Sequence, residues 1–209
     1  MSDALHTRKE YTRASLEAHD LMEYPLRQLE EWLEDAVNAG IVEPNAMTLS
    51  TVSATGRPSS RVVLLRGVDT GLVFYTNYAS RKGQDITATG VACANFWWGD
   101  LERQVRVEGT VLPVSADESD AYFHSRPHES QLASAASPQS QPITREDLET
   151  RVMELRQQYP ECVPRPAHWG GFRLTPDRVE FWQGRAARLH DRIVYTLETA
   201  RWVKTRLAP

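Results

Sequence analysis

The stretch AMTLSTVSATGRPSSRVVLLRGVDTGLVFYTN, residues 46–77, decides the fold class. It contains three short runs rich in β-branched and aromatic residues, AMTLSTVS, SSRVVLLRGV and LVFYTN. The turn-forming sequences ATGRP and DTG separate these runs, which is the pattern of antiparallel strands joined by short connections. Two further runs of the same kind follow, VACANFWW at 91–98 and RQVRVEGTVLPV at 103–114. The centre of the chain is therefore predicted to form a β-barrel or a β-sandwich.

Helical and strand patterns on either side of this centre complete the expected architecture. PLRQLEEWLEDAVNAG, residues 25–40, predicts a helix because Pro25 suits a first turn and Gly40 suits a stop. Helical patterns return at 117–126 and at 143–159, with a small, polar loop or short helix between them. Strand patterns follow at 170–175, then a Pro-Asp turn, then strands at 178–184, 191–198 and 201–207.

We therefore expect a mainly β protein with peripheral helices, an α+β arrangement in which the helices lie outside a barrel. The polar segment 1–24 is expected to be a mobile N-terminal arm, and residues 25–209 a single domain.

Composition excludes several classes of protein. The 209 residues carry a formal net charge of -4, which argues against general nucleic-acid binding. A run of about 18 apolar residues is absent, so a membrane span is not expected. The first residues lack the apolar core of a signal peptide, and the two cysteines, Cys93 and Cys162, have no metal-type spacing. These features favour a cytoplasmic protein without disulfides.

Two basic segments could bind phosphate. Arg61 and Arg66 bracket the run RVVLLR, and a guanidinium makes forked contacts to phosphate, although strand-end arginines are often only solvated. In FYTNYASRKGQDI, residues 74–86, a strand gives way to a helix whose first turn contains Arg81 and Lys82. Backbone N–H groups at a helix start favour anions, and a solvated helix start is the alternative.

A third set lies in AYFHSRPHESQ, residues 121–131. Tyr122, Arg126 and Ser130 recur every four residues and offer the hydroxyl and guanidinium donors that suit a phosphate monoester. The alternative is an amphipathic helix end. Gln104, in LERQVRVEG, could both donate to and accept from the edge of a heterocycle, although most strand glutamines are simply exposed.

The segment EFWQGRAARLHDR, residues 180–192, gathers arginines around a histidine in an acidic chain. Arg188 and His190 alternate, so on a strand they would share a face, and Trp182 supplies a flat surface nearby. A structural or exposed histidine is the usual alternative. The sequence has no Walker A motif, no G-x-G-x-x-G and no H-E-x-x-H. The separate sets of cations and hydroxyls suggest that the protein binds more than one phosphate.

The order of these motifs resembles the pyridoxine (pyridoxamine) 5′-phosphate oxidase family. The resemblance rests on RKEY, RVVLL, FYTN-x-x-SRKG, LERQVRVEG, YFHSRP-x-x-SQ, HWGGFR, EFWQG, RLHDR and the closing RLAP. It implies an FMN-binding split β-barrel and a homodimer with FMN at the subunit interface. It also implies oxidation of pyridoxine 5′-phosphate or pyridoxamine 5′-phosphate to pyridoxal 5′-phosphate, with O₂ as electron acceptor, H₂O₂ as product and ammonia released from the amine.

The resemblance also implies roles for individual residues. The expected FMN-binding residues are Arg61, Val62, Val63, Leu64, Leu65, Arg66, Tyr75, Thr76, Arg81, Lys82, Gln104, Gln139, Ser140, Trp182 and Arg192. The expected substrate-binding residues are Arg8, Lys9, Glu10, Tyr11, Arg66, Tyr122, Arg126, Ser130, Arg188, Leu189 and His190. Arg188 and His190 are the expected catalytic pair. The resemblance does not identify which group, if any, accepts the substrate proton. Arg66 stands where the family usually has lysine.

Two alternatives to this interpretation remain. One is another flavin-using split-barrel oxidoreductase, and the other is a non-catalytic protein that binds FMN or pyridoxal phosphate. The YFHSRP and RLHDR motifs speak against the first, and retention of both the flavin set and the Arg188/His190 pair speaks against the second.

Overall fold

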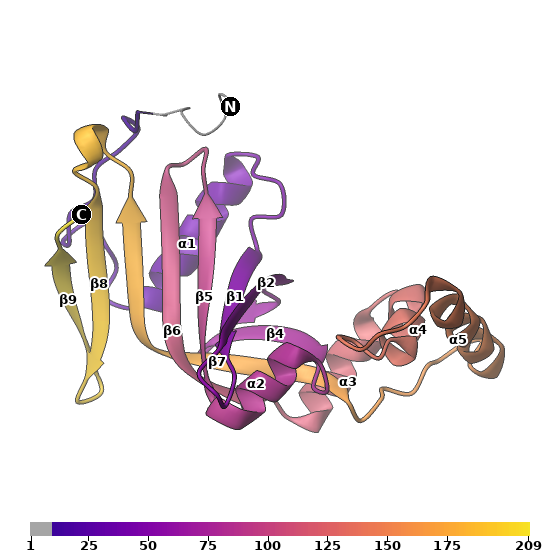
Figure 1. Ribbon diagram of the computed structural model, residues 1–209. Helices are drawn as coiled ribbons and strands as arrows, with labels where there is room; N and C mark the ends of the chain where they lie inside the picture. The colour runs from indigo at the N-terminus through magenta and orange to yellow at the C-terminus, as the bar shows by residue number, and fades with distance from the viewer. Residues whose placement is uncertain (1–9) are drawn as a thin grey trace, which may run out of the picture.

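A computed structural model describes residues 10–209 and shows one curled antiparallel sheet with helices at its periphery (Figure 1). The strands pair in the order β2-β1-β5-β6-β7-β4-β3, and β8 lies between β7 and β9. The strands are β1 (Ala46–Val52), β2 (Pro58–Leu64), β3 (Gly67–Val68), β4 (Leu72–Asn77), β5 (Val91–Trp98), β6 (Arg103–Pro113), β7 (Trp169–Gln183), β8 (Asp191–Glu198) and β9 (Arg201–Leu207). The helices are α1 (Pro25–Asn38), α2 (Arg81–Thr89), α3 (Ala116–Ser125), α4 (His128–Ala136), α5 (Arg145–Gln158) and the 3₁₀ turn η2 (Ala186–Arg188). The predicted mainly β class with peripheral helices is confirmed.

Strand β7 is continuous, where the sequence predicted two strands separated by a Pro-Asp turn. The register of β6 against β7 shifts between Glu108 and Gly109, and Gly109 faces Pro176 across this bulge. A Cβ on Gly109 would lie 2.0 Å from the carbonyl oxygen of Thr175, so only glycine allows this approach. Pro176 has no N–H to donate across the sheet. The bulge interrupts the regular hydrogen-bond ladder at this position, so none is required there. Pro176 therefore lies at the irregularity of one strand that pairs with β6 on one edge and, on the other edge, with β4 before Pro176 and with β8 after it.

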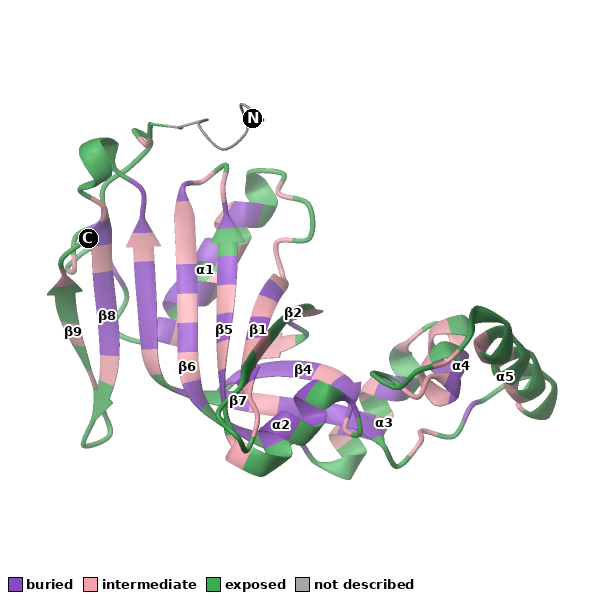
Figure 2. Ribbon diagram, in the orientation of Figure 1, coloured by how far each residue is buried: buried purple, intermediate pink, exposed green. Residues whose placement is uncertain are grey.

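Helix α1 covers one face of the sheet and forms the main core with it. Its residues Leu29, Trp32 and Ala36 are buried at helical spacing. The Trp32 ring meets Phe181 of β7 edge-on at a centroid distance of 5.0 Å. Strands β5 and β6 alternate buried residues with residues of intermediate or full exposure, which Figure 2 shows as bands along each arrow. This alternation leaves the opposite face of the sheet accessible.

A second, smaller core lies where α3 and α4 meet the start of β7. It consists of Phe123, Leu132, Val163 and Trp169. Helices α4 and α5 extend away from the main sheet, and α5 contains no fully buried residue (Figures 1 and 2). The position of these helices therefore depends on how α3 is attached to the sheet.

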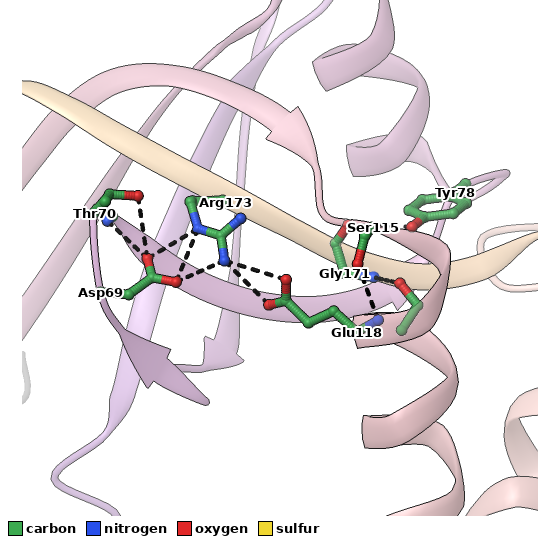
Figure 3. A network of polar contacts seen from close by, with 9 residues as sticks. Asp69, Thr70, Tyr78, Ser115, Glu118, Gly171 and Arg173 are labelled. Carbon is green, nitrogen blue, oxygen red and sulfur yellow. Dashed lines mark hydrogen bonds and ion pairs between the residues drawn. The ribbon is translucent and has the colours of Figure 1, made fainter.

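A network of polar contacts attaches α3 to β7 (Figure 3). Arg173 of β7 donates to both carboxylate oxygens of Asp69, with Nη2 at 2.6 Å from Oδ2, and to Glu118 of α3 at 3.2 Å. The hydrogen bond from Arg173 holds the pKa of Asp69 below its usual value. Two neutral bonds accompany the ion pairs, because Tyr78 donates to the Gly171 carbonyl and the Gly171 N–H donates to Ser119. The network fixes the first turns of α3, which positions its later residues.

The described part of the N-terminal segment packs along β8 and β9 without forming a helix or strand. Leu16 and Leu21 are buried in the main core. Tyr195 donates to the Met22 carbonyl at 2.6 Å, and Lys204 donates to the Ala18 carbonyl at 3.1 Å. The mobility predicted for residues 1–24 stays a prediction. Within residues 10–209, the structure contains no helix that has both the length and the apolar character needed to span a bilayer.

Candidate active site

A pocket of about 800 Å³ opens between β2, β4, the start of α2 and the α3–α4 pair. Most of the residues expected to bind a cofactor or a phosphorylated substrate line it. These are Arg61, Val62, Val63, Leu64, Arg66, Tyr75, Thr76, Arg81, Lys82, Tyr122, Arg126, Gln139 and Ser140. Leu65, from the same set, is instead a core residue with 6% exposure, because it follows β2 on the opposite side from its neighbours.

Arg61 is held at the pocket by hydroxyl groups that lead to a buried carboxylate. Its Nη1 donates to Thr51 Oγ1 at 2.8 Å, and its Nη2 donates to Ser59 Oγ at 2.6 Å. Both hydroxyls in turn donate to Asp85 Oδ2, at 2.7 and 3.1 Å. Burial lowers the pKa of Arg61, and Arg81 adds to this effect while Asp85 opposes it. The guanidinium is therefore fixed in direction and partly deprived of water.

Two more cations lie at the start of α2. Ser80 caps this helix by accepting from the Gly83 N–H, and the Arg81 N–H donates to Ser140 Oγ at 3.2 Å. Lys82 Nζ donates to Thr76 Oγ1 at 2.9 Å and to Gln139 Oε1 at 2.8 Å. Burial, followed by repulsion from Arg61, lowers the pKa of Lys82 to about 8. An anion beside these residues would favour the charged form of Lys82 and offset its repulsion from Arg61.

A second cationic centre lies in another part of the same pocket. The Arg126 guanidinium lies over the Trp169 ring at 4.7 Å and donates to Ser134 Oγ at 2.9 Å. Burial lowers the pKa of Arg126, and the charge of Arg66 lowers it further. Ser130 does not line the pocket; its carbonyl accepts from Arg126 Nη2 at 3.0 Å. Arg66 and Arg126 thus offer charge for a second anion.

Aromatic rings form a wall of the pocket. Tyr75 and Tyr122 stack at a centroid distance of 3.8 Å, and Trp169 lies parallel to both. Burial raises the pKa of Tyr75 to about 12, so its phenol stays neutral at physiological pH. The wall is therefore flat, uncharged and bordered by cations.

The other expected site residues gather at the opposite end of the sheet, around the loop between β7 and β8 (Figure 1). Trp182 lies beside His190 with ring centroids 4.7 Å apart, and Tyr11 meets both rings edge-on at 5.7 and 5.6 Å. Gln104 of β6 pairs in register with Trp182. Glu10, Arg188 and Leu189 are exposed, and Leu189 has 61% exposure. Arg8 and Lys9 lie outside the described residues.

Arg188 and His190 lie in the loop between the strands β7 and β8 and not on a strand, so the shared face that alternation gives on a strand does not apply to them. Ala187 and Arg188 have positive φ angles of 54° and 62° within η2, which follows the end of β7 at Gln183. The Arg185 N–H donates to His190 Nδ1 at 3.1 Å. Because a backbone amide can only donate, Nδ1 accepts and the neutral ring has its proton on Nε2.

Arg192, expected at the flavin, pairs with a buried carboxylate in this chain. Its Nε and Nη2 donate to the two oxygens of Glu180 at 2.7 and 3.1 Å, and these bonds raise the pKa of Arg192. Its Nη1 donates to the Ala208 carbonyl. The side chain is therefore held in one direction by a forked ion pair.

The sequence did not indicate several residues that support the site. Asp85, Thr51 and Ser59 hold Arg61, Ser134 and Trp169 hold Arg126, and Asp191 binds the loop residue Arg185 at 3.3 Å. Trp169, Asp191 and Asp85 lie in segments that the sequence analysis singled out, HWGGFR, RLHDR and FYTNYASRKGQDI, but these segments did not indicate their supporting roles. The others are small hydroxyl residues whose roles depend on contacts between distant segments.

Sequence comparisons match most of the chain to one family of oxidases. A sequence model of pyridoxamine 5′-phosphate oxidase matches residues 33–159, and one of the pyridoxine 5′-phosphate oxidase C-terminal dimerisation region matches 169–209. Proteins named pyridoxine/pyridoxamine 5′-phosphate oxidase from Paraburkholderia phytofirmans and Bordetella pertussis are 51% and 52% identical to it. The first match covers 100% of both chains and the second covers 97% of both.

Comparisons with solved structures agree with these sequence matches. The structure of PhzG from Burkholderia lata 383, in complex with tetrahydrophenazine-1-carboxylic acid, superposes with a TM-score of 0.89 at 33% identity. The match covers 95% of this chain and 99% of that one. A pyridoxamine 5′-phosphate oxidase-related, FMN binding protein from Nostoc punctiforme has a TM-score of 0.71 at 19% identity, over 90% of this chain and 100% of that one. This second likeness confirms the split-barrel fold alone.

Proposed function

The chain belongs to the pyridoxine/pyridoxamine 5′-phosphate oxidase family, and on that premise we propose that it converts pyridoxine 5′-phosphate and pyridoxamine 5′-phosphate to pyridoxal 5′-phosphate with bound FMN. The alcohol and O₂ give the aldehyde and H₂O₂. The amine, O₂ and water give the aldehyde, ammonia and H₂O₂. The reaction would serve the synthesis and salvage of pyridoxal 5′-phosphate. We propose the cytoplasm as its location, since Cys93 and Cys162 are both free thiols.

One observation carries this proposal: the pocket has two separate cationic centres joined by a flat aromatic wall. Arg61, Arg81 and Lys82 suit the phosphate of FMN, because three cations and a helix start converge there. Arg66 and Arg126 suit the phosphate of the substrate. A single phosphorylated ligand would use only one of these centres.

The donor set fits FMN in chemistry as well as in charge. Thr76, Gln139 and Ser140 offer neutral hydrogen-bonding groups beside Lys82, which suit a ribityl chain. FMN, when bound, supplies the two-electron acceptor that amino-acid side chains lack. The residues of this chain then have to fix the orientation of the substrate and exclude water.

The loop residues are proposed to reach the site from a second copy of the chain. Trp182, Arg188, His190 and Arg192 do not line the pocket, and all lie in the segment similar to a dimerisation region. The accessible face of the sheet supports a homodimer, because large apolar side chains lie exposed there. They are Val62, Val91, Trp97 and Leu112. FMN would then lie at the subunit interface.

We propose that Arg188 and His190 orient the substrate ring and stabilise negative charge on it. Since His190 Nδ1 accepts from Arg185, its Nε2–H is the group available to donate to the substrate. This makes His190 a hydrogen-bond donor in the neutral state. Tyr11 packs against His190, which supports a covering role for Arg8–Tyr11 and a lid role for the N-terminal arm.

The test is to purify the protein, record its flavin spectrum and add each phosphorylated substrate in air. We expect bound FMN, pyridoxal 5′-phosphate and an equal amount of H₂O₂. Tetrahydrophenazine-1-carboxylic acid, which the PhzG structure contains, is the comparison substrate because it has a carboxylate in place of a phosphate. A yellow protein that oxidises neither phosphorylated substrate would refute the oxidase proposal and favour a flavin-binding protein.

A further inference from the structure

A buried carboxylate at the start of β8 binds three segments of the chain: the N-terminal arm, the loop between β7 and β8, and β9. Asp191 has 2% exposure. Its Oδ2 accepts from the Leu16 N–H at 3.0 Å, and its Oδ1 accepts from Arg206 Nη1 at 2.6 Å and from Arg185 Nη1 at 3.3 Å. Burial by itself would raise the pKa of Asp191, but these donors outweigh it and the pKa is lowered. The carboxylate is therefore ionised and fully bonded.

The first of these segments is the N-terminal arm. Within residues 10–15, Arg13 attaches the arm to the turn between β5 and β6: its N–H donates to Glu102 Oε2 at 3.1 Å and its guanidinium donates to the Asp100 carbonyl. Arg206, itself bound to Asp191, also donates to the Leu16 carbonyl at 2.8 Å. The Leu16 N–H is thus held by the Asp191 carboxylate directly. The Leu16 carbonyl is held by Arg206, which Asp191 positions.

The second segment is the loop that contains Arg188 and His190. Arg185 binds Asp191 with its side chain and His190 with its backbone N–H. Tyr11 of the arm packs on this loop: a methyl group on Gly184 would come within 2.7 Å of the Tyr11 ring. The arm and the loop therefore meet twice, at Tyr11 and at Asp191.

We propose that Asp191 is a positioning residue that couples the N-terminal arm to the substrate loop, so that one carboxylate fixes both Tyr11 and the His190 ring. The coupling extends the proposed function, since its effect on turnover depends on that function. Its structural effects are measurable without any substrate.

The first experiment measures Asp191→Asn in the full-length protein. The amide keeps the volume and can still accept from Leu16, but it loses the charge that holds Arg185 and Arg206. We expect trypsin to cleave after Arg13 about tenfold faster, because local opening of the arm becomes easier. We expect kcat/KM for pyridoxine 5′-phosphate to fall about tenfold, with FMN content unchanged. Equal cleavage rates for the variant and the parent would overturn the arm half of the proposal.

A double-mutant cycle separates coupling from general damage. If Asp191 acts through the arm, Asp191→Asn should lower kcat/KM no more than about twofold in a Tyr11→Ala background. If the two substitutions lower kcat/KM independently, so that their factors multiply in the double variant, the coupling is overturned. Glu17→Gln is the matched control, because Glu17 also binds Arg206, at 2.7 Å, but does not touch Asp191. It should change neither cleavage nor kinetics.

A third measurement tests the loop without turnover. The ¹⁵N shifts of the His190 ring should show an unprotonated Nδ1 in the parent and a tautomer-averaged ring in Asp191→Asn. If Asp191→Asn fails to fold, Arg185→Gln replaces it, since that side chain is half exposed and its loss leaves Leu16 bound. If the variant that folds gives the same His190 signal as the parent, the proposed link between Asp191 and the substrate loop is overturned. If oxidation is absent while these signals change, the proposed function fails and the coupling stands.

Discussion

At the scale of single residues, the site depends on charged groups that lie close together and are partly shielded from water. Lys82 is the clearest case, because burial and Arg61 lower its pKa to about 8. A lowered lysine pKa means that the folded protein favours the neutral amine, so the charge is lost as the pH rises through about 8. A phosphate favours the charged amine, so binding above that pH requires proton uptake.

This linkage predicts a pH-dependent affinity for FMN. Between pH 7 and pH 9 the Kd should increase about tenfold, since the fraction of charged Lys82 falls by about that factor. Fluorescence titration of the FMN-free protein measures it. Lys82→Gln should bind more weakly at pH 7 and show a nearly flat profile. A parent protein with the same Kd at both pH values would mean that Lys82 does not face the phosphate.

A second residue-scale prediction concerns the carboxylate behind Arg61. Asp85→Asn should raise the Kd for FMN about tenfold, near 1.4 kcal/mol, because Thr51 and Ser59 lose the charged acceptor that orients them toward Arg61. Glu34→Gln, an exposed acid on α1, is the control and should leave the Kd unchanged. If Asp85→Asn binds FMN as tightly as the parent, the orientation of Arg61 does not depend on this relay.

At the scale of elements, local sequence patterns predicted most of the fold and part of the site. Alternating apolar residues fixed β5 and β6, and the start of α2 was recognisable from Ser80 to Lys82. The η2 turn was not predictable, because Ala187 has no intrinsic preference for a positive φ angle. The continuity of β7 through Pro176 was also missed, since it depends on Gly109 in another strand. Such features are set by tertiary contacts, which the local pattern does not contain.

The attachment of α3 gives the element-scale prediction. Arg173→Met removes the ion pairs to Asp69 and Glu118 that hold this helix (Figure 3). These carboxylates are partly exposed, so we expect a loss of about 1 kcal/mol and a Tm lower by about 2–4 °C. Because Tyr122 lies on α3 and Arg126 directly follows it, the KM for the substrate should rise several-fold while FMN affinity stays constant. A lower Tm with an unchanged KM would limit the network to a structural role.

At the scale of the whole molecule, the described chain separates the two halves of the expected site. Arg126 lines the pocket, while Arg188 lies in the loop at the other end of the sheet (Figure 1). A single-chain site would need a large rearrangement of β7, which is buried along most of its length. A symmetric dimer needs none, because each copy can contribute its loop to the pocket of the other.

Mixing two defective variants tests this arrangement. Arg126→Ala and Arg188→Ala should each lower turnover strongly as homodimers. After denaturation and joint refolding at equal amounts, half of the dimers should contain one copy of each variant. Each mixed dimer would have one site with both arginines and one with neither, so activity should recover to about one quarter of that of the parent. The separately refolded variants, mixed afterwards, are the control. Failure to recover beyond that control would place both arginines in one chain's site and refute the shared site.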